Sequence, residues 1–565
     1  MQNLPRPEYP RPRFVRENWI NLNGEWQFEI DHGKSGKARG LMSGSELKDR
    51  IIVPFCPESE LSGVNHKDFM ECVWYRRVIV LPEGWQNDGR RTILHIGACD
   101  YRAEVWVNGK SAGTHFGGYV SFSFDITALL QKGENEIVIC AEDNLRSHTQ
   151  PGGKQSTKFA SYGCSYTRTT GIWQTAWMEN VPAAYIAETK CTPDIEAGTL
   201  SIEAVCADAH GMTLKAEATW NGKTVGVASG VVTGKSARMT LKLDELHLWS
   251  NEDPALYDLK LTLGEDAVQS YFGMRSIAYV DGKLLLNGKV VFQRLVLDQG
   301  FYPDGIYTAP TDEALKGDIL MSMAMGFNGA RLHEKVFEPR FLYHCDKLGY
   351  LVWGEHANWC LDISRVDAYK NFLPEWLEVM RRDYNHPAII GWCPLNETQE
   401  DQDPDFVKSL AALTRAYDST RPYIDASGWT HVSDTSDILD LHDYDQDPVS
   451  FKAKMDKIAA GEPVKSFLGG TFCPSFISEY GGIWWSNSDD GWGYGDRPTS
   501  EEEFIARFKG LTEAILDCPA ICALCYTQLT DVEQEQNGLY TYDRKAKFDP
   551  AIISAILKRK AAIEE

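Results

Sequence analysis

The sequence has no long hydrophobic run, and it carries less positive than negative charge. No stretch approaches the ~18 apolar residues of a membrane-spanning helix, and the N-terminal MQNLPRPEYPRPRF has no apolar core like that of a signal peptide. Lys and Arg total 57 against 80 Asp and Glu, a formal net charge of −23, whereas nucleic acids and anionic membranes bind basic patches. We therefore expect a cytoplasmic protein with neither a nucleic-acid nor a membrane partner.

The 14 cysteines show no repeated spacing that would indicate a disulfide framework or a metal site. One CxxC occurs, at Cys522 and Cys525, but it lies inside the apolar run ICALCYT and has no second pair. This pattern suits a reducing compartment, and we expect neither a metal nor a cofactor.

Aromatic residues, by contrast, are abundant: they make up 11% of the chain, with 17 Trp. Exposed aromatic side chains often face sugars or other flat ligands. The 565 residues are too many for one hydrophobic core, since domains average about 150 residues. We therefore expect a multidomain protein.

The first two predicted domains are β-sandwiches. Residues 1–182 alternate with period two, as in FSFDIT, which is typical of strands with one buried face, and we predict a β-sandwich. Residues 183–280 continue the alternation and contain the turn Asn221-Gly222. Their length of about 100 residues favours an immunoglobulin-like sandwich, although the Cys…Trp…Cys pattern of antibody domains is missing.

From residue 281 to residue 565 strands alternate with helices, which favours a (β/α)8 barrel. Leu315, Ile319 and Met323 recur every four residues in one helical segment, and Gly326 ends it. The eight strand candidates are VVFQRLVLD, FNGARLH, YLVWGEH, AIIGWCPLNE, YIDASG, ILDLHDY, SFISEYGG and ICALCYTQLTD. Active sites of such barrels lie at the carboxyl ends of the strands.

Polar residues stand where these strands end: Glu355, Asn396 with Glu397, Tyr444 and Glu479. Any single glutamate at a strand end could equally form a salt bridge or cap a loop. Two carboxylates facing each other across a barrel mouth are what cleavage of a glycosidic bond requires. A gap of ~5 to 5.5 Å between them indicates retention of configuration, and ~6.5 to 9.5 Å indicates inversion.

The whole chain resembles glycoside hydrolase family 2, the family of β-galactosidases, β-glucuronidases and β-mannosidases. The segments LNGEWQFEI, AEVWVNGKSAGTHFGGYVSFSFDIT, GIWQTAW and LWSNEDPALYDLKL resemble its jelly-roll and immunoglobulin-like domains. The resemblance implies that residues 1–182 form a jelly roll of the sugar-binding type. GFNGARLHEKVFEPRFLYHCDKLGYLVWGE resembles its barrel strands 2 and 3.

The resemblance implies roles for the residues at the strand ends. Glu397, after Asn396, matches the family's general acid/base, and Glu479 in ISEYGG matches its nucleophile. Tyr444 matches the tyrosine that bonds the nucleophile, and Arg331 and Glu355 match the polar residues that end strands 2 and 3. We expect Arg331 and Tyr444 to lower the pKa of Glu479, and burial beside Glu479 to raise the pKa of Glu397.

Several positions depart from the family pattern or allow two interpretations. His333 lies one position out of register, Tyr526 replaces a strand 8 tryptophan as an aromatic platform, and Asp298 either contacts the sugar or caps its loop. Trp484, Trp485 and Trp492 lie in an aromatic loop that either stacks on sugar or packs internally. HDYD, residues 442–445, resembles a metal cluster, but we expect none; SYGCSYT, residues 161–167, could also reach the pocket.

The sequence therefore predicts an exo-acting, retaining β-glycosidase that acts on a glycoside substrate, first of all as a β-galactosidase. The alternatives are a uronidase, acting on β-galacturonides or β-glucuronides, and an arabinofuranosidase or galactofuranosidase. The Asn-x-Lys triplet of the family's glucuronidases is missing after Glu479, although Lys335 or Arg497 could replace it. A carbohydrate-binding protein without catalysis predicts the loss of a carboxylate, and both are present. The sequence does not determine the oligomeric state, and a homo-oligomer is one of the possible states.

Overall fold

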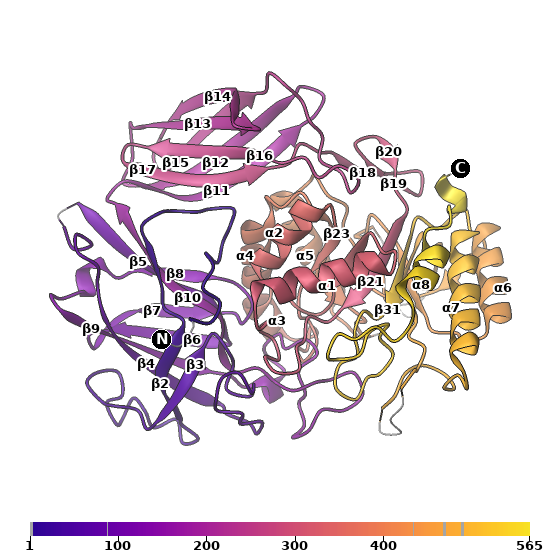
Figure 1. Cartoon of the computed structure of the whole chain (residues 1–565), viewed down its shortest axis with the longest axis horizontal. Coiled ribbons are helices and arrows are strands. Elements are labelled where there is room, and N and C mark those ends of the chain that lie inside the picture. Colours follow the sequence, from indigo (N-terminus) through magenta and orange to yellow (C-terminus); the bar gives the residue numbers. More distant parts are fainter. Residues whose placement is uncertain are drawn as a thin grey trace.

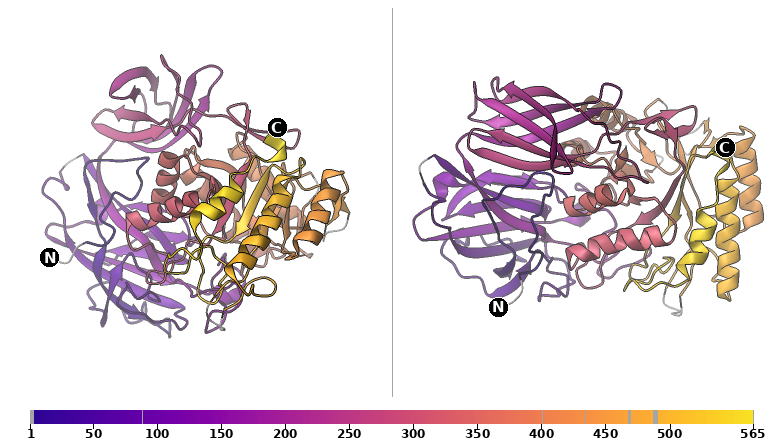
Figure 2. Two further views of the ribbon diagram at one scale, coloured as in Figure 1. Left: turned by 45° about the vertical axis from the view of Figure 1, so that its right-hand side comes forward. Right: turned by 45° about the horizontal axis from the view of Figure 1, so that its top comes forward.

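The computed structural model describes residues 4–87, 89–399, 401–432, 434–466, 470–486 and 491–564. Figure 1 shows two β domains next to an α/β domain. The N-terminal sandwich and the second sandwich lie on one side of the α/β domain, and Figure 2 shows the same arrangement from two further directions. The predicted fold class is confirmed.

The N-terminal domain is a sandwich of two antiparallel sheets with strand orders β3-β2-β4-β9-β6-β7 and β1-β10-β5-β8. Its core holds Trp26, Phe28 and Tyr75 from the first sheet against Leu94 and Ile172 from the second. The strands are β1 (Trp19–Asn21), β2 (Gly24–Ile30), β3 (Asp49–Val53), β4 (Cys72–Val80), β5 (Arg90–Asp100), β6 (Arg102–Val107), β7 (Lys110–Phe116), β8 (Phe122–Asp125), β9 (Glu134–Glu142) and β10 (Gly171–Pro182), with the short helices η1 (Thr127–Leu129) and η2 (Leu145–Ser147).

The second domain pairs a sheet of order β11-β12-β15 with one of order β14-β13-β16-β17. Alternate residues of its strands are buried, as the period-two pattern predicts; β15, for example, buries Ala237, Met239 and Leu241. The strands are β11 (Tyr185–Asp194), β12 (Thr199–Ala207), β13 (Thr213–Trp220), β14 (Lys223–Val231), β15 (Ser236–Lys242), β16 (Tyr257–Leu263) and β17 (Asp266–Phe272). A small sheet of β18 (Ile277–Val280), β19 (Lys283–Leu286) and β20 (Lys289–Val290) leads into the last domain.

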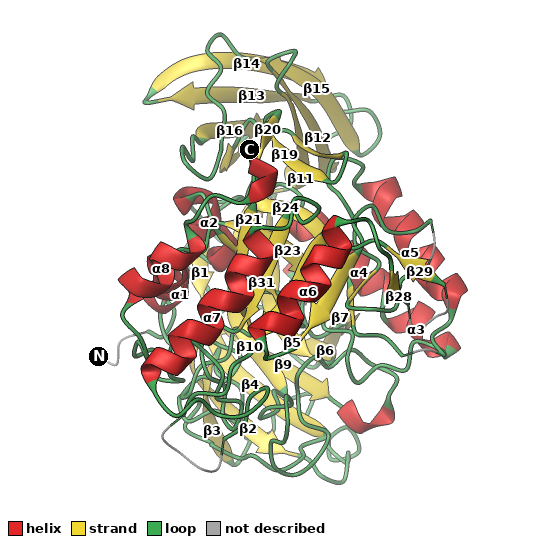
Figure 3. Cartoon of the chain, turned by 90° about the vertical axis from the view of Figure 1, so that its right-hand side faces the viewer, coloured by secondary structure: helices red, strands yellow, loops and turns green. Residues whose placement is uncertain are grey.

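The last domain is a curled parallel sheet of order β24-β23-β22-β21-β31-β30-β27 with helices on its outside (Figure 3). The strands are β21 (Gln293–Asp298), β22 (Gly329–Leu332), β23 (Leu351–Glu355), β24 (Ile389–Cys393), β25 (Leu395–Asn396), β26 (Ala426–Ser427), β27 (Asp440–Asp443), β30 (Phe476–Gly481) and β31 (Ala523–Thr527), besides a hairpin of β28 (Val464–Lys465) and β29 (Thr471–Phe472). The helices are α1 (Asp312–Ala324), α2 (Pro339–Leu348), α3 (Val366–Asn371), α4 (Leu373–Asp383), α5 (Pro404–Tyr417), α6 (Pro448–Ala459), α7 (Glu501–Leu516), α8 (Pro550–Leu557) and η3 (Ala562–Glu564).

The fifth barrel strand, β26, is only two residues long, and side chains complete the ring there. β26 pairs in parallel with β25, the continuation of the fourth strand. On its other side, Asp440 on β27 accepts bonds from Ser427 Oγ at 2.6 Å and from the Gly428 amide at 3.2 Å. All eight predicted strand segments therefore contribute to one barrel.

The N-terminal sandwich contributes directly to the core of the barrel. Tyr119, Tyr166 and Trp173 belong to the same buried cluster as the barrel strands. The Tyr119 amide also donates to Glu375 on α4 at 2.9 Å. The two domains therefore share a core, and the loops of the first can reach the barrel mouth.

No helix in the described part of the chain combines the length and the apolar character needed to cross a membrane. All 14 cysteines are free, and Cys522 and Cys525 are buried.

Candidate active site

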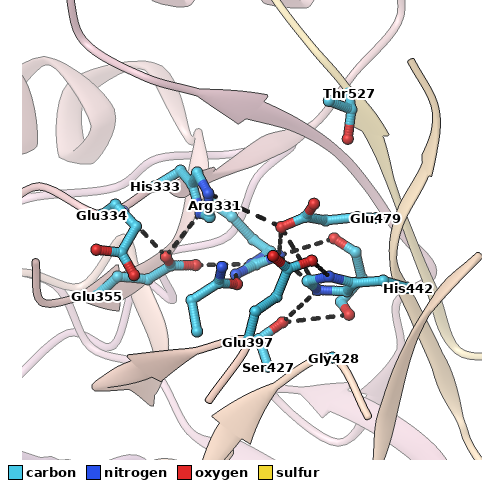
Figure 4. A network of polar contacts seen from close by, with 12 residues as sticks. Arg331, His333, Glu334, Glu355, Glu397, Ser427, Gly428, His442, Glu479 and Thr527 are labelled. Atoms are coloured by element: carbon cyan, nitrogen blue, oxygen red, sulfur yellow. Dashed lines mark hydrogen bonds and ion pairs between the residues drawn. The ribbon is translucent and has the colours of Figure 1, made fainter. Parts of the chain in front are cut away.

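Arg331 joins three strand ends into one polar network (Figure 4). It lies on β22, is 1% exposed, and donates from Nε to Glu355 at 2.6 Å. Its two other nitrogens donate to Glu479 Oε1 at 2.9 Å and to Asn396 Oδ1 at 3.0 Å. A buried guanidinium with three acceptors fixes the directions of all three side chains.

Glu479, at the end of β30, is held in the ionised form. Its second oxygen accepts a short bond from the Tyr444 hydroxyl, which also contacts Thr527 Oγ1 at 3.0 Å. Burial raises the pKa of Glu479, but the neighbouring His442 and, after it, the charge of Arg331 lower it overall. The side chain therefore suits the nucleophile role predicted for it.

Glu397 follows β25 with a backbone φ of 45°, in the left-handed region, which turns its side chain back toward the barrel mouth. Its Oε1 lies 2.7 Å from His442 Nδ1. Burial raises the pKa of Glu397, but the bond from His442 and the charges of Lys154 and Arg331 lower it overall. The expectation of a raised pKa is therefore wrong for the unliganded protein, because His442 was not foreseen as a partner.

His442 connects the two predicted catalytic carboxylates. Its Nε2 lies 2.9 Å from Ser427 Oγ and 3.4 Å from Glu479 Oε1. His442 and Tyr444 are two residues apart on one strand end, so the spacing that places Tyr444 in the site also indicated His442. The signal was present in the sequence and was interpreted only as a resemblance to a metal cluster.

One oxygen of Glu397, one of Glu479 and a ring nitrogen of His442 lie within 4.8 Å of one another. This upper limit on the gap between the two carboxylates favours a retaining pair, whose carboxyl groups stand about 5 to 5.5 Å apart, over an inverting pair at about 6.5 to 9.5 Å. The same three groups could ligate a metal ion, but the Arg331 guanidinium, 3.4 Å from His442, opposes a second cation there. The neighbouring Asp443 and Asp445 pair with Lys454 on α6 instead.

Asn396 offers an unused donor in the pocket. Its Oδ1 accepts from Arg331, and its backbone is fixed by Asn358, whose Oδ1 accepts from the Asn396 amide at 2.7 Å. The Nδ2 atom is buried and has no hydrogen-bond partner among the described residues. A buried amide donor without a hydrogen-bond partner indicates that a ligand supplies the acceptor.

Glu355 and His333 form the back of the network. His333 Nδ1 lies 3.2 Å from Glu355 Oε2, and its Nε2 lies 3.9 Å from Glu479. Burial and the charge of Lys154 lower the pKa of His333 well below its usual value. His333 is therefore a neutral hydrogen-bonding group, and its shifted register still brings it into the site.

Comparison with known proteins identifies the family. Models of the glycosyl hydrolases family 2 match residues 59–152 (sugar binding domain), 184–275 and 280–449 (TIM barrel domain). The chain belongs to glycoside hydrolase family 2. The predicted resemblance is confirmed, and the protein is a glycoside hydrolase by family.

Several relatives found by sequence carry β-glucuronidase names. The cat enzyme is 27% identical over 469 residues, 73% of this chain and 69% of the relative. A Formosa agariphila protein with a provisional β-glucuronidase name is 30% identical, and the match spans 57% of this chain but only 39% of that longer protein. The rat β-glucuronidase is 28% identical, with 75% of this chain and 71% of the relative matched.

Solved β-glucuronidases share the fold. The Lactobacillus rhamnosus enzyme superposes with a TM-score of 0.82 at 18% identity, covering 99% of each chain. The Ruminococcus gnavus enzyme in complex with D-glucuronic acid gives 0.81 at 18% identity, covering 98% of this chain and all of the other. At this identity the likeness is evidence of architecture alone.

Two residues assigned to the sugar site of this family 2 protein lie elsewhere. Asp298 accepts from the Gly300 amide at 2.9 Å, and burial next to Asp318 raises its pKa to about 7, so it caps its loop on the helix side. Tyr526 is fully buried between Phe508 on α7 and Tyr480 on β30. Neighbouring strand residues alternate in direction, so Thr527 faces the pocket and Tyr526 does not.

The aromatic loop after β30 is divided between packing and the pocket. Trp485 packs against Phe504 and Phe548 of the core, so the packing interpretation holds for it. Trp492 donates from Nε1 to the Gly163 carbonyl at 2.8 Å and thereby ties the loop to the N-terminal domain. Trp484 has a buried Nε1 without a partner among the described residues, and its sugar-stacking role stays a prediction.

Neither cation proposed to replace the Asn-x-Lys triplet bonds to the strand-end carboxylates in a contact of the described structure. Lys335 donates to the carbonyls of Gly300 and Tyr307, and burial lowers its pKa to about 8. Arg497 is exposed, donates to the Ser486 carbonyl at 3.1 Å and lies over Trp484. Both lie outside the network around Arg331.

The N-terminal domain closes one side of the pocket, as predicted for SYGCSYT. Residues 162–165 of that loop line a cavity of about 680 Å³ together with Glu397 and Trp359. The Tyr166 hydroxyl donates to Glu535 at 2.5 Å. The same domain supplies Lys154, which sequence reasoning missed because a loop of another domain gives no strand-end signal.

Proposed function

We propose that this family 2 glycoside hydrolase is an exo-acting, retaining β-uronidase, with a β-glucuronide as the preferred substrate. The observation that carries the reaction type is that one oxygen of Glu397, after β25, and one oxygen of Glu479, on β30, lie within 4.8 Å of each other across the barrel mouth. The substrate class follows from the relatives, which carry β-glucuronidase names. These relatives favour the uronidase alternative over the β-galactosidase that was the first prediction from sequence.

In the first step the Glu479 carboxylate attacks the anomeric carbon, and the bond to the glycosidic oxygen breaks. Glu397 gives its proton to that oxygen, and the aglycone leaves as an alcohol. In the second step Glu397 takes a proton from water, whose oxygen attacks the same carbon and releases Glu479. Two inversions return the sugar in its original β configuration.

The network prepares Glu479 for attack. Arg331 and Tyr444 each bond one of its oxygens, which keeps the carboxylate ionised and aimed. Asn396 Nδ2, which is buried and unpaired among the described residues, would donate to a sugar hydroxyl, most directly the 2-hydroxyl. The buried setting of these groups suits one terminal sugar rather than an internal one.

A carbohydrate-binding protein without catalysis is disfavoured, because both carboxylates are present and one oxygen of each lies within 4.8 Å of the other. An arabinofuranosidase or galactofuranosidase gains no support from the named relatives.

A panel of 4-nitrophenyl glycosides tests the proposal directly: β-glucuronide, β-galacturonide, β-galactoside, β-mannoside and α-arabinofuranoside. We expect kcat/KM for a β-uronide to exceed kcat/KM for every neutral glycoside by at least about 100-fold. A site that binds a charged group rejects substrates that lack this group. Proton NMR of the first-formed product should show the β anomer. A preference for the galactoside, or an α anomer, would contradict the proposal.

A further inference from the structure

Lys154 carries a buried ammonium group at the edge of the catalytic pocket. It lies in the loop QPGGKQST of the N-terminal domain and is 6% exposed. Its Nζ lies 3.6 Å from the centre of the Trp359 ring, a cation–π contact. Within the described chain Nζ has no hydrogen-bond acceptor and no ion pair, which is unusual for a buried amine.

The position of Lys154 is fixed by the barrel. The amides of Gly152 and Gly153 donate to the Trp359 carbonyl at 2.9 and 3.2 Å, and the Tyr166 amide donates to the Lys154 carbonyl at 2.7 Å. Trp359 in turn donates from Nε1 to the Asn396 carbonyl at 3.2 Å. The Trp359 ring therefore lies between the Lys154 ammonium group and the strand end that carries Glu397. The loop is therefore rigid where it presents Lys154.

The carboxylates near Lys154 are already bonded to other groups. The two oxygens of Glu535 accept from Tyr166 and Asn537. The two oxygens of Glu479 accept from Arg331 and Tyr444. Burial lowers the pKa of Lys154, but the neighbouring Cys164 and the charges of Glu397, Glu535 and Glu479 raise it overall. Lys154 forms no ion pair with any of these carboxylates in the described structure.

The other basic side chains in or near the pocket are bonded to protein groups, neutral, or outside the network around Arg331. Arg331 donates its hydrogen bonds to Glu355, Glu479 and Asn396, and His333 is neutral. Lys335 and Arg497 lie outside the network. Lys154 is thus the ammonium whose donors the described structure leaves for a ligand.

We propose that Lys154 binds the carboxylate of the uronide substrate and so determines the selectivity for uronides over neutral glycosides. This inference rests on the proposed function. An ammonium–carboxylate bond in a water-poor pocket is strong, and a neutral sugar, which carries a hydroxymethyl group there, cannot replace it. Recognition of the acid group thus comes from the N-terminal domain and not from a barrel loop.

Another role for Lys154 would be to offset the negative charge of Glu397, Glu479 and Glu535 whatever the substrate. The two roles differ in what the variant Lys154→Met does. Loss of a charge offset changes the turnover of all glycosides alike, whereas loss of the carboxylate ligand affects uronides selectively.

The test compares Lys154→Met with the wild type and with Lys158→Met, a matched control on the same loop whose lysine is exposed and lies over Tyr162. For the β-uronide that the wild type hydrolyses, kcat/KM of Lys154→Met should fall by about 10²- to 10³-fold, mainly through KM. The inhibition constant of the free uronic acid should rise by at least about tenfold. For the matching neutral glycoside kcat/KM should change by less than about threefold, and Lys158→Met should behave as the wild type in every assay.

The outcomes separate the two proposals. If the wild type hydrolyses no β-uronide, the proposed function fails, and this inference fails with it. If the wild type hydrolyses a uronide, and Lys154→Met keeps its inhibition constant or loses uronide and neutral turnover equally, only the role of Lys154 is overturned. An unchanged melting temperature shows that the variant is folded. A lowered melting temperature together with loss of activity on every substrate would show that Lys154 stabilises the fold and does not select the substrate.

Discussion

The two strand-end glutamates differ in what surrounds them, and this difference predicts different behaviour on mutation. Glu479 is bonded on both oxygens, by Arg331 and Tyr444. Glu397 is bonded through one oxygen to His442, and its side chain, 19% exposed, lines the cavity. An ionised, immobile carboxylate suits attack, and an accessible one suits proton exchange with a leaving group and with water.

We expect Glu479→Ala to lower kcat by at least about 10⁴-fold for every substrate, because no other group can form the glycosyl intermediate. Glu397→Ala should spare the first step for aryl glycosides with good leaving groups, which need little protonation, and should stall in the second. Added azide should then restore turnover and yield a β-glycosyl azide, identified by NMR. Azide rescue of Glu479→Ala alone, or an α-azide from Glu397→Ala, would reverse the two roles.

His442 also sets the pH range of activity. Glu397 must be protonated for the first step, so activity is present below its pKa and is lost as the pH rises through it. Burial raises that pKa, and the bond from His442 is the largest influence that lowers it, ahead of the charges of Lys154 and Arg331.

Removing the bond in His442→Ala should therefore raise the pKa of Glu397 and move the alkaline limb of the kcat/KM profile to higher pH. The profile is measured with the aryl β-uronide across the range in which wild type and variant stay folded. A limb that stays in place, or moves to lower pH, would show that His442 does not control the proton of Glu397.

At the scale of elements, the loop from Gly152 to Gln155 must lie closely against the barrel. Gly153 has φ 57°, and a Cβ built on it would lie 2.3 Å from the Glu334 carbonyl oxygen. Alanine there meets both backbone strain and a clash with backbone atoms, which cannot move aside as a side chain can.

We expect Gly153→Ala to displace Lys154 and to lower kcat/KM for the uronide by roughly 10- to 100-fold, a size typical of a misplaced binding group. Gly234→Ala is the matched control, since Gly234, in a turn of the second sandwich, has a similar φ of 64° but no atom within 4 Å of its added Cβ. Equal kinetics of the two alanine variants would show that the tight approach of Gly153 has no bearing on the site.

At the scale of the whole molecule, the barrel depends on the domain before it. Tyr119, Tyr166 and Trp173 of the N-terminal sandwich are fully buried in the barrel's own core cluster. Arg275, between the second sandwich and the barrel, donates to the Pro387 and Ile389 carbonyls. Removing these domains exposes apolar surface that water would otherwise not reach.

A fragment that begins near Asp281 should therefore be insoluble, or soluble and inactive, because it lacks both its covering surface and Lys154. Expression of residues 281–565 beside the full chain, followed by a solubility measurement and a uronide assay, checks this. Full activity in the fragment would refute the dependence.

The amino-acid sequence by itself determined the architecture and which polar side chains stand at the strand ends. Period-two alternation specifies which strand residues are buried, and strand–helix alternation specifies a parallel barrel, so these features are local and readable. Strand ends of a barrel converge on one face, so Arg331, Glu355, Asn396, Glu397, Tyr444 and Glu479 could be expected to meet. The structure brings them together, while their catalytic roles stay proposals.

Only the tertiary structure decided which residues on those strands face the pocket and what reaches it from elsewhere. Asp298 and Tyr526 lie at strand ends but point outward, because direction depends on register within the closed barrel. His442 came within bonding distance of Glu397 only through the curvature that brings β25 and β27 together. Lys154 lies 243 positions before Glu397 in the chain, and docking between domains, which no local pattern encodes, places it beside the site.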